Sequence, residues 1–387
     1  MFKRIFTGRV SIWGAPVSLL LTVLALFVRA DGIDGNATVT TIDAPKPPEQ
    51  PQSGPGGKDV AHAEVIAESY GSGPQGYWLF EPAKPMPEQA PLIVFNHGWG
   101  AMDPRIYKAW IDHIVERGNI VVYPLYQDSL RTVVPDFTPN AIAAVQDAIH
   151  TLQSEPGHVK PQLDKFAIVG HSMGGPISAN MAALWKTDGL PFPRAVLCVE
   201  PGKTWGTPTW ATIQLADLSQ IPAGTLLLTV VGDQDHLVRD IDAKRIFNES
   251  TQVPLANKNY VTLVSDDHGE PALKANHMAP VAWEQMPEVK QPVDSKPVGP
   301  LRELLRQRIE ERSEADDGMP DFNNTDTNRT LDALDFYGTW KLLDGLTDAA
   351  FYGRDRNYVL GNTPQQRFMG VWSDGVPVKE LMVTDHP

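Results

Sequence analysis

Cysteine is almost absent from this sequence. Cys198 is the single cysteine among 387 residues, so the fold contains no internal disulfide. It lies in the apolar run RAVLCVEPG, where burial would raise a thiol pKa and disfavour a nucleophilic role. HExxH motifs, paired Cys/His clusters and phosphate-binding loops are also missing from the sequence. We therefore expect no metal or organic cofactor.

Positive charge is scarce as well. The chain has 33 Lys and Arg residues against 47 Asp and Glu residues, which gives a formal net charge of -14. A phosphate backbone would be repelled by such a surface unless a basic patch interrupted it, and the sequence contains no obvious patch. Nucleic acid is therefore not expected as a partner.

Long apolar runs are confined to the N-terminus. Basic residues precede the run VSLLLTVLALFV, and Ala30 offers a small residue at a cleavage site. These features predict a signal peptide over residues 1–30 and an exported protein, periplasmic or secreted. The alternative is an uncleaved membrane anchor, which would be the only membrane contact, although Gly14 and Pro16 interrupt the run.

The rest of the chain divides by composition into three parts. Residues 31–60 are rich in proline and glycine and are predicted to form a disordered linker. Residues 61–286, with alternating apolar and amphipathic runs, are predicted to be a catalytic domain. Residues 287–387 are predicted to be a C-terminal extension packed on that domain, because its helical segments are too apolar to stand alone. Within it we expect a helix over 331–353 and two strands in 367–383.

The apolar runs of the middle part predict an α/β fold. Two runs, 64–71 and 76–83, indicate an antiparallel leading strand pair. Six continuous apolar runs follow, as expected for strands buried on both faces of a parallel sheet: 91–98, 119–126, 165–172, 194–202, 225–233 and 260–267. Helical patterns separate them, one of them over 138–153 with Thr138 as its expected N-cap. The prediction is a doubly wound, mostly parallel sheet.

One of these runs ends abruptly in the sequence GHSMGG and continues as a helix. A strand that ends in Gly-x-Ser-x-Gly and passes directly into a helix forces the serine into a tight, strained turn. Ser172 would then lie above the strand ends, over the N-terminus of the next helix, where free N–H groups and the helix dipole favour negative charge. Ser172 is the candidate nucleophile.

Four motifs together resemble the α/β-hydrolase fold and, within it, the esterase, lipase and cutinase-like polyester hydrolase branch. They are GHSMGG at 170–175, FNHGWG at 95–100, VVGDQDHLV at 230–238 and ANHMAP at 275–280. The resemblance covers about residues 61–283. It implies a Ser-His-Asp triad that cleaves carboxylic esters through an acyl-enzyme, with an oxyanion hole made by the N–H groups of Met173 and Trp99.

The acid and the base of this triad each have two candidates. Asp233 and Asp235 both follow the run 225–233, and the family's acid turn selects Asp235 and leaves Asp233 as a turn residue. His268 directly follows the run 260–267, whereas His277 lies in the family-like ANHMAP turn. We favour His277 as the base and keep His268 as the alternative, since the segment HGEPALK has no counterpart in the family's pattern.

Aromatic residues near these motifs suggest the kind of substrate. Trp205 and Trp210 follow the run 194–202 and, with Trp99, could form an apolar wall for a small-molecule, lipid or polymer ester. Core packing is the alternative for both. His97 is expected to be a structural hydrogen-bonding residue. Two other functions fit the same motifs: a peptidase or acyltransferase with the same triad, and a non-catalytic exported binding protein on the hydrolase scaffold.

Overall fold

The computed structural model describes residues 43–205, 211–282 and 330–387. The chain separates into two units, residues 1–43 and 44–387, and the fold described here is that of the second. The predicted signal peptide (1–30), Trp210 and residues 287–329 of the predicted extension lie outside the described residues. No helix in the described ranges combines the length and apolarity needed to cross a bilayer.

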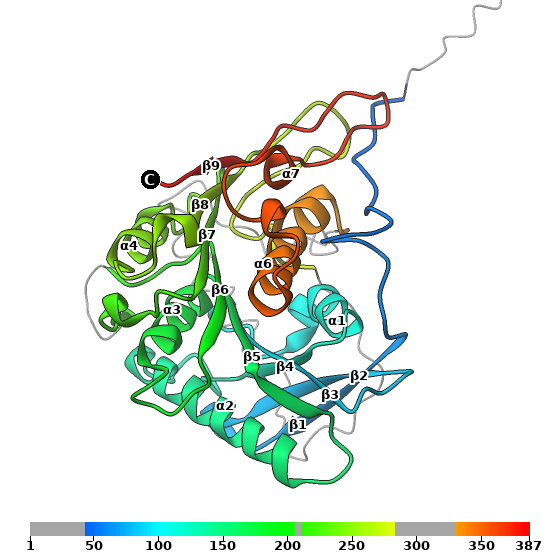
Figure 1. Cartoon of the computed structure of the whole chain (residues 1–387). Helices are drawn as coiled ribbons and strands as arrows, with labels where there is room; N and C mark the ends of the chain where they lie inside the picture. The colour runs from blue at the N-terminus through cyan, green and yellow to red at the C-terminus, as the bar shows by residue number, and fades with distance from the viewer. Residues whose placement is uncertain (1–42, 206–210, 283–329) are drawn as a thin grey trace, which may run out of the picture. The chain divides into compact units, whose positions relative to one another are not determined.

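A single nine-stranded sheet forms the centre of this unit, with the strand order β1-β2-β4-β3-β5-β6-β7-β8-β9. The strands from β4 to β8 in this order are parallel, whereas β1, β2 and β9 are antiparallel to their neighbours. The predicted doubly wound, mostly parallel sheet with a leading antiparallel pair is confirmed (Figure 1). The strands are β1 (Glu64–Tyr70), β2 (Tyr77–Ala83), β3 (Gln89–Asn96), β4 (Ile120–Pro124), β5 (Lys160–His171), β6 (Pro193–Val199), β7 (Leu226–Gly232), β8 (Lys258–Leu263) and β9 (Met382–Thr384).

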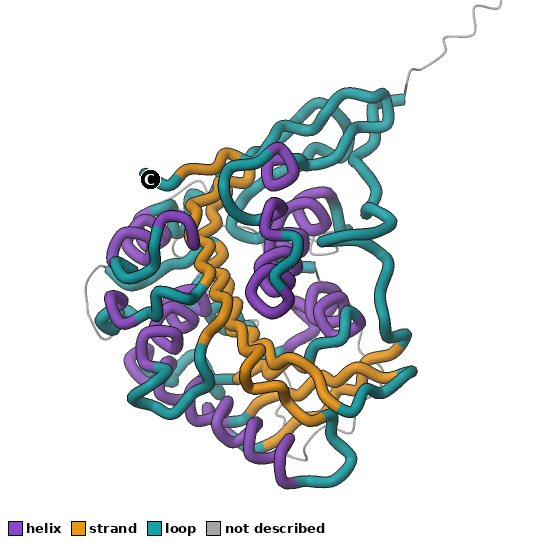
Figure 2. The backbone as a smooth tube through the Cα atoms, in the orientation of Figure 1, coloured by secondary structure: helices purple, strands orange, loops and turns teal. Residues whose placement is uncertain are grey.

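Helices cover both faces of the sheet, as Figures 1 and 2 show. One face carries α1 (Lys108–Glu116) and α6 (Lys341–Tyr352), and the other carries α2 (Phe137–Ser154), α3 (Gly174–Leu184) and α4 (Ile241–Glu249). Two large apolar clusters, one on each face, fill the space between sheet and helices. The expected N-cap Thr138 is wrong, because α2 already begins at Phe137, with Asp136 at the N-cap position. The shorter segments are η1 (Gly73–Gln75), η2 (Pro104–Tyr107), η3 (Val134–Asp136), η5 (Leu218–Gln220), η6 (Leu255–Asn257), the π-helical η8 (Leu334–Trp340), η9 (Arg356–Tyr358) and α7 (Pro364–Arg367).

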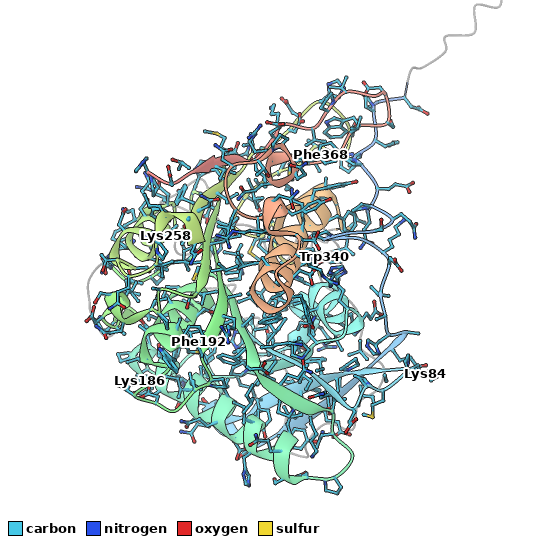
Figure 3. All side chains as sticks on the ribbon, viewed as in Figure 1. Lys84, Lys186, Phe192, Lys258, Trp340 and Phe368 are labelled. Carbon is cyan, nitrogen blue, oxygen red and sulfur yellow. The ribbon has the colours of Figure 1, made fainter. Side chains whose placement is uncertain are left out.

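The described C-terminal residues 330–387 are integral to this sheet. Helix α6 packs on β5 and β6, and Trp340, which Figure 3 labels, lies at the end of η8. Its ring stacks on that of His113 of α1, with the centroids 4.5 Å apart. Strand β9 extends the sheet by pairing with β8. The expected pair of strands within 367–383 is confirmed only in part. The two arms pair about the turn through a bridge between Val371 and Pro377 and a bond from the Val378 N–H to Gly370 O, whereas the one strand assigned there, β9, pairs with β8. The turn between the two arms also binds other segments, for example through the bond from the Lys46 N–H to Ser373 Oγ.

Residues 44–60 are ordered against the C-terminal segment. The N–H of Gly56 donates to Asp344 Oδ2 at 2.7 Å, and the N–H of Glu270 donates to the carbonyl of Pro45 at 2.8 Å. The expectation of a disordered linker over 31–60 therefore does not hold for its described part. Glycine has no side chain and proline has no backbone N–H, but the remaining backbone groups of the segment still form hydrogen bonds with the neighbouring segments.

Candidate active site

The candidate site lies at the carboxyl edge of the parallel strands. Ser172 directly follows β5, Asp235 lies in the turn after β7, and His277 lies in the long loop after β8. Parallel strands that run the same way end at the same edge of the sheet, so side chains that are far apart in sequence meet there. Ser172 and His277 are 105 positions apart in the chain.

These three side chains form one hydrogen-bonded chain. His277 Nε2 lies 2.9 Å from Ser172 Oγ, and His277 Nδ1 lies 2.8 Å from Asp235 Oδ2. The second oxygen of Asp235 accepts the N–H groups of Leu237 at 2.9 Å and Val238 at 3.1 Å, which fixes the carboxylate. All three members of the chain are buried.

The protonation of this chain follows from its surroundings. Burial opposes the charge of Asp235, but the hydrogen bond and charge of His277, together with the two backbone N–H groups, lower the pKa of Asp235 below its ordinary value. An ionised Asp235 accepts the Nδ1–H of His277. His277 Nε2 is then the acceptor for the hydroxyl proton of Ser172.

The backbone at Ser172 is strained in the way the sequence predicted. Its φ is +56°, in the left-handed region that non-glycine residues rarely adopt. The turn is held by bonds from the Ser172 N–H to Val199 O and from the Gly175 and Gly202 N–H groups to Ser172 O. A Cβ on Gly174 would lie 2.0 Å from the carbonyl oxygen of Asn96, so only glycine lets α3 start this close to β3.

The loop after β3 passes beside the nucleophile. A Cβ on Gly98 would lie 3.4 Å from Ser172 Cβ. The Gly98 N–H donates to Tyr107 Oη at 3.1 Å, and the Gly100 N–H donates to Gln127 Oε1 at 2.9 Å. Among the described residues, no acceptor is recorded for the N–H groups of Trp99 and Met173. These are the two N–H groups that the sequence analysis predicts as the oxyanion hole.

A buried relay joins this loop to the loop that carries His277. Tyr107 Oη lies 2.7 Å from His171 Nδ1, and His171 Nε2 lies 2.8 Å from the carbonyl oxygen of His277. Burial lowers the pKa of His171 to about 4, so its ring is neutral. Tyr107 therefore donates to Nδ1 while it accepts the Gly98 N–H, and His171 donates its Nε2–H to His277. The sequence analysis missed both residues, although His171 is the variable position of the GHSMGG turn itself.

The two histidines after β8 have different partners. His268 is exposed, and its Nε2 lies 2.8 Å from Asp374 Oδ2 in the C-terminal segment. A bridge between Asp266 and Leu273 folds the intervening residues into a small loop, which carries His268 toward that segment and returns the chain to the site. His277 alone of the two contacts Ser172.

Two other predicted residues have structural surroundings. Asp233 accepts the N–H of Ser265 at 3.0 Å and also binds its hydroxyl, as a turn residue would. The ring of His97 lies 2.9 Å from the carbonyl of Leu125 and stacks on Tyr126 with centroids 4.1 Å apart. Burial lowers the pKa of His97 to about 4.

Two tryptophans from loops of the site are exposed. Trp99, between Gly98 and Gly100, is 41% exposed, and Trp205, in the loop after β6, is 49% exposed. Core packing is therefore wrong for Trp205, and Trp210 lies outside the described residues. Leu237, two residues after Asp235, is exposed as well. Apolar side chains exposed on site loops offer contact area to an apolar substrate.

One group of side chains could hold a metal ion by distance alone. Possible ligand atoms of His171, Glu200 and His277 lie within 4.8 Å of one another. The ring nitrogens, however, already take part in the hydrogen bonds to Tyr107, His277 O, Ser172 and Asp235 described above. A metal would have to break this chain, so we assign these residues to hydrogen bonding.

Comparison with protein-family models finds a match over part of the chain. The Chlorophyllase family model matches residues 54–208, less than half of the chain, and the match includes the loop after β3 and the Ser172 turn. No curated protein sequence matches the chain.

Several solved esterase structures are similar at low identity. A mutant of the esterase rPPE is 18% identical, and the match covers 53% of this chain and 75% of that chain with a TM-score of 0.42. One of two Rhizomucor miehei esterases is 14% identical, and the match covers 53% of this chain and 77% of that chain with a TM-score of 0.42. A thermostable esterase from Pseudomonas putida ECU1011 is 19% identical, and the match covers 53% of this chain and 74% of that chain with a TM-score of 0.40.

Proposed function

We propose that this protein is a serine hydrolase that cleaves carboxylic esters through an acyl-enzyme. The observation that carries the proposal is the hydrogen-bonded chain from Ser172 through His277 to Asp235, with the serine in a strained turn. The match of the Chlorophyllase family model to residues 54–208 supports the same reaction class.

The first half-reaction forms the acyl-enzyme. Ser172 Oγ attacks the carbonyl carbon of the ester while His277 Nε2 takes the hydroxyl proton. Asp235 keeps the imidazole in the required tautomer and stabilises the cation that forms. The negative oxygen of the tetrahedral intermediate accepts the N–H groups of Met173 and Trp99 at the positive end of α3. The carbon–oxygen bond to the alcohol then breaks, and His277 returns the proton to the leaving oxygen.

The second half-reaction repeats these steps with water. His277 takes a proton from the water as its oxygen attacks the acyl carbon of the Ser172 ester. The same two N–H groups stabilise the second tetrahedral intermediate. When the bond to Ser172 Oγ breaks, His277 gives the proton back to the serine, and the carboxylic acid leaves.

We propose an apolar ester as the substrate, a small molecule, a lipid or a polymer. The exposed rings of Trp99 and Trp205 support this choice, since they give an apolar acyl or alcohol group a surface to cover. Hydrolysis of p-nitrophenyl esters of increasing acyl length tests it. Activity that rises from acetate to longer chains is expected, and activity confined to acetate would remove the lipid and polymer classes. The cutinase-like branch remains a prediction within this proposal.

We also propose that the protein is exported, because its first thirty residues have the composition of a signal peptide. Cell fractionation of the full-length chain, with N-terminal sequencing of the product, tests this. A mature chain that begins near Asp31 is expected. An uncleaved chain in the membrane fraction would favour the anchor.

The reaction class is tested with a fluorophosphonate probe and an ester substrate. The wild-type chain should be labelled and active, and Ser172→Ala should lose labelling and at least about a thousand-fold in kcat. Ser154→Ala, which changes an exposed serine at the end of α2, is the matched control. A wild-type chain that is not labelled would point to a non-catalytic binding protein. Turnover of peptides but not esters would point to a peptidase.

The choice of base is tested with two histidine variants. His277→Ala should lower kcat/KM by at least about a thousand-fold, because the proton acceptor for Ser172 is removed. His268→Ala should keep most of the activity, since its ring binds Asp374 instead. The opposite ranking would assign the base to His268.

A further inference from the structure

A second buried carboxylate lies beside His277. Glu200 directly follows β6, and its side chain is completely buried. Glu200 Oε2 lies 3.8 Å from His277 Nδ1, the same nitrogen that meets Asp235 Oδ2 at 2.8 Å. The same Glu200 oxygen lies 3.3 Å from His171 Nε2. The triad described above does not use this group.

The backbone of Glu200 is fixed in an unusual conformation. Its φ is +46°, and its N–H donates to the carbonyl of Val230 on β7 at 2.7 Å. A Cβ on Gly232 would lie 2.9 Å from Glu200 Oε1, so the glycine leaves room for the carboxyl group. A strained non-glycine residue persists only where its surroundings hold it, and such residues cluster at functional sites.

Of the groups described so far near Glu200, His277 is the one that becomes a cation in the proposed reaction. Burial lowers the pKa of His171 to about 4, which keeps that ring neutral. Burial, together with the charge of Glu200, raises the pKa of Tyr107, so the phenol is neutral too. Asp235 is itself an anion. The imidazolium of His277, which forms when Ser172 is deprotonated, is therefore close to two carboxylates.

We propose that Glu200 is a positioning residue for His277, a second carboxylate that stabilises the imidazolium and can accept its Nδ1–H when Asp235 cannot. A movement of the Glu200 carboxylate by about 1 Å would bring Oε2 as close to His277 Nδ1 as Asp235 Oδ2 is now. The inference rests on the proposed ester hydrolysis, in which His277 becomes a cation.

Kinetics of three variants of the full chain test the proposal: Glu200→Gln, Asp235→Ala and the double variant. Glu200→Gln keeps the shape and a hydrogen-bond acceptor but removes the charge. It should lower kcat/KM about 10-fold and move the acid limb of the pH profile to lower pH, because an imidazolium without a nearby anion loses its proton more readily. In the Asp235→Ala background, Glu200→Gln should lower kcat/KM by a factor about 10-fold larger than in the wild type, since neither of the two carboxylates beside His277 would remain.

A direct titration separates this inference from the proposed function. The pKa of His277, followed by NMR in chains labelled with 15N-histidine, should fall by about one pH unit in Glu200→Gln. Asp233→Asn, which removes an exposed carboxylate in the turn after β7, should leave this pKa unchanged. The measurement needs no turnover, so a fall in the pKa of a chain inactive on esters would contradict only the proposed function.

Two results would overturn the role of Glu200. One is an unchanged His277 pKa and acid limb in Glu200→Gln, even if the variant is less stable, because a purely structural residue would act that way. The other is an equal fold-decrease in kcat/KM for Glu200→Gln in the wild-type and Asp235→Ala backgrounds, since the effects of independent residues on kcat/KM multiply.

Discussion

Tyr107 is the residue that connects the two halves of the candidate site. Its hydroxyl accepts the Gly98 N–H and donates to His171, and His171 in turn binds the carbonyl of His277. The loop after β3 and the loop that carries His277 are therefore joined through one buried hydroxyl. A phenol with this role fixes geometry without entering the reaction.

Tyr107→Phe should therefore reduce catalysis more than its effect on stability alone would suggest. We expect kcat to fall about 10-fold, since the Gly98 loop and the His277 loop lose their common anchor, with a stability loss of about 1–3 kcal/mol. Tyr77→Phe is the matched control, because its buried hydroxyl binds Thr151 and Asp147 of α2, outside the relay and outside both loops. It should show a similar stability loss with unchanged kcat. Equal kcat values in the two variants would contradict the role of Tyr107.

Two buried histidines predict how stability depends on pH. Burial lowers the pKa of both His97 and His171 to about 4, from an ordinary value of 6.5. As the pH falls below about 6.5, the unfolded chain takes up protons that the folded chain takes up only near pH 4, so the free energy of unfolding decreases in this window. Above the window these groups contribute no pH dependence.

Urea denaturation between pH 7 and pH 4.5 measures this effect. His97→Gln should reduce the slope of unfolding free energy against pH by about 1.4 kcal/mol per pH unit, the value for one proton. His150→Gln, which changes a histidine on the exposed surface of α2, should leave the slope unchanged. The prediction is wrong if His97→Gln and wild type have parallel curves.

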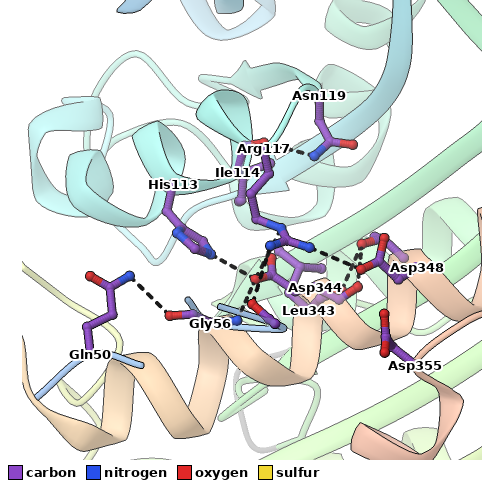
Figure 4. Close-up of polar contacts among 12 residues, drawn as sticks. Gln50, Gly56, His113, Ile114, Arg117, Asn119, Leu343, Asp344, Asp348 and Asp355 are labelled. Carbon is purple, nitrogen blue, oxygen red and sulfur yellow. Dashed lines mark hydrogen bonds and ion pairs between the residues drawn. The ribbon is translucent and has the colours of Figure 1, made fainter. Parts of the chain in front are cut away.

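At the scale of elements, α6 is joined to α1 by a buried ionic network (Figure 4). Asp344 of α6 lies 2.8 Å from His113 Nε2 and 3.3 Å from Arg117 Nε, and it also accepts the Gly56 N–H. Burial opposes the charge of Asp344, but the charges of His113 and Arg117 and the hydrogen bonds lower its pKa below the ordinary value. Its contribution to stability is present above its unfolded-state pKa and is lost as the pH falls through the folded-state value.

Asp344→Asn should destabilise the protein by about 3 kcal/mol at pH 7. The variant removes the negative charge that faces the buried ring of His113 and the partly buried guanidinium of Arg117, which is the costly way to break a buried ion pair. Asp355→Asn, close to the network but at a position with φ of +58°, is the control, because asparagine also tolerates this conformation. Chemical denaturation should show little change for the control. A similar small change for Asp344→Asn would mean that α6 is held by its apolar contacts alone.

The element boundaries show where local pattern is enough. The parallel strands appear where apolar runs predicted them, because a strand buried on both faces must be apolar along its whole length. The C-terminal strands were predicted less well. In that segment Trp372 Nε1 binds Asp266 and Lys46 binds Ser373, so bonds to distant residues accompany a pairing about the turn that is shorter than the expected ladder.

At the scale of the whole unit, residues 44–60 connect the C-terminal segment to α1 and to the loop after β8. Pro48 is buried against Gly370, so closely that a Cβ on this glycine would lie 2.7 Å from the proline ring. The Gly56 N–H donates a hydrogen bond to Asp344. The segment thus contributes to the stability of the compact unit without contributing a helix or strand.

A chain that starts at residue 61 should therefore be less stable than one that starts at residue 44. Removing the segment leaves Asp344 without the Gly56 N–H and exposes apolar surface of the C-terminal segment, and we expect a decrease of several degrees in Tm. Both chains should still be labelled by a fluorophosphonate, because residues 44–60 form their hydrogen bonds with other segments and not with Ser172, His277 or Asp235. Equal Tm values would show that the segment binds without stabilising the unit.

The sequence by itself determined the sheet, the strained turn at Ser172 and the short set of candidates for the acid and the base. These features depend on local chemistry: apolar runs, glycines where backbones approach closely, and polar residues at strand ends. Only the tertiary structure decided which late histidine meets Ser172, that His171 and Tyr107 join the two loops, that Glu200 lies beside His277 and that residues 44–60 are ordered. Each of these depends on the path of a loop or on contacts between residues far apart in the chain, which no local pattern encodes.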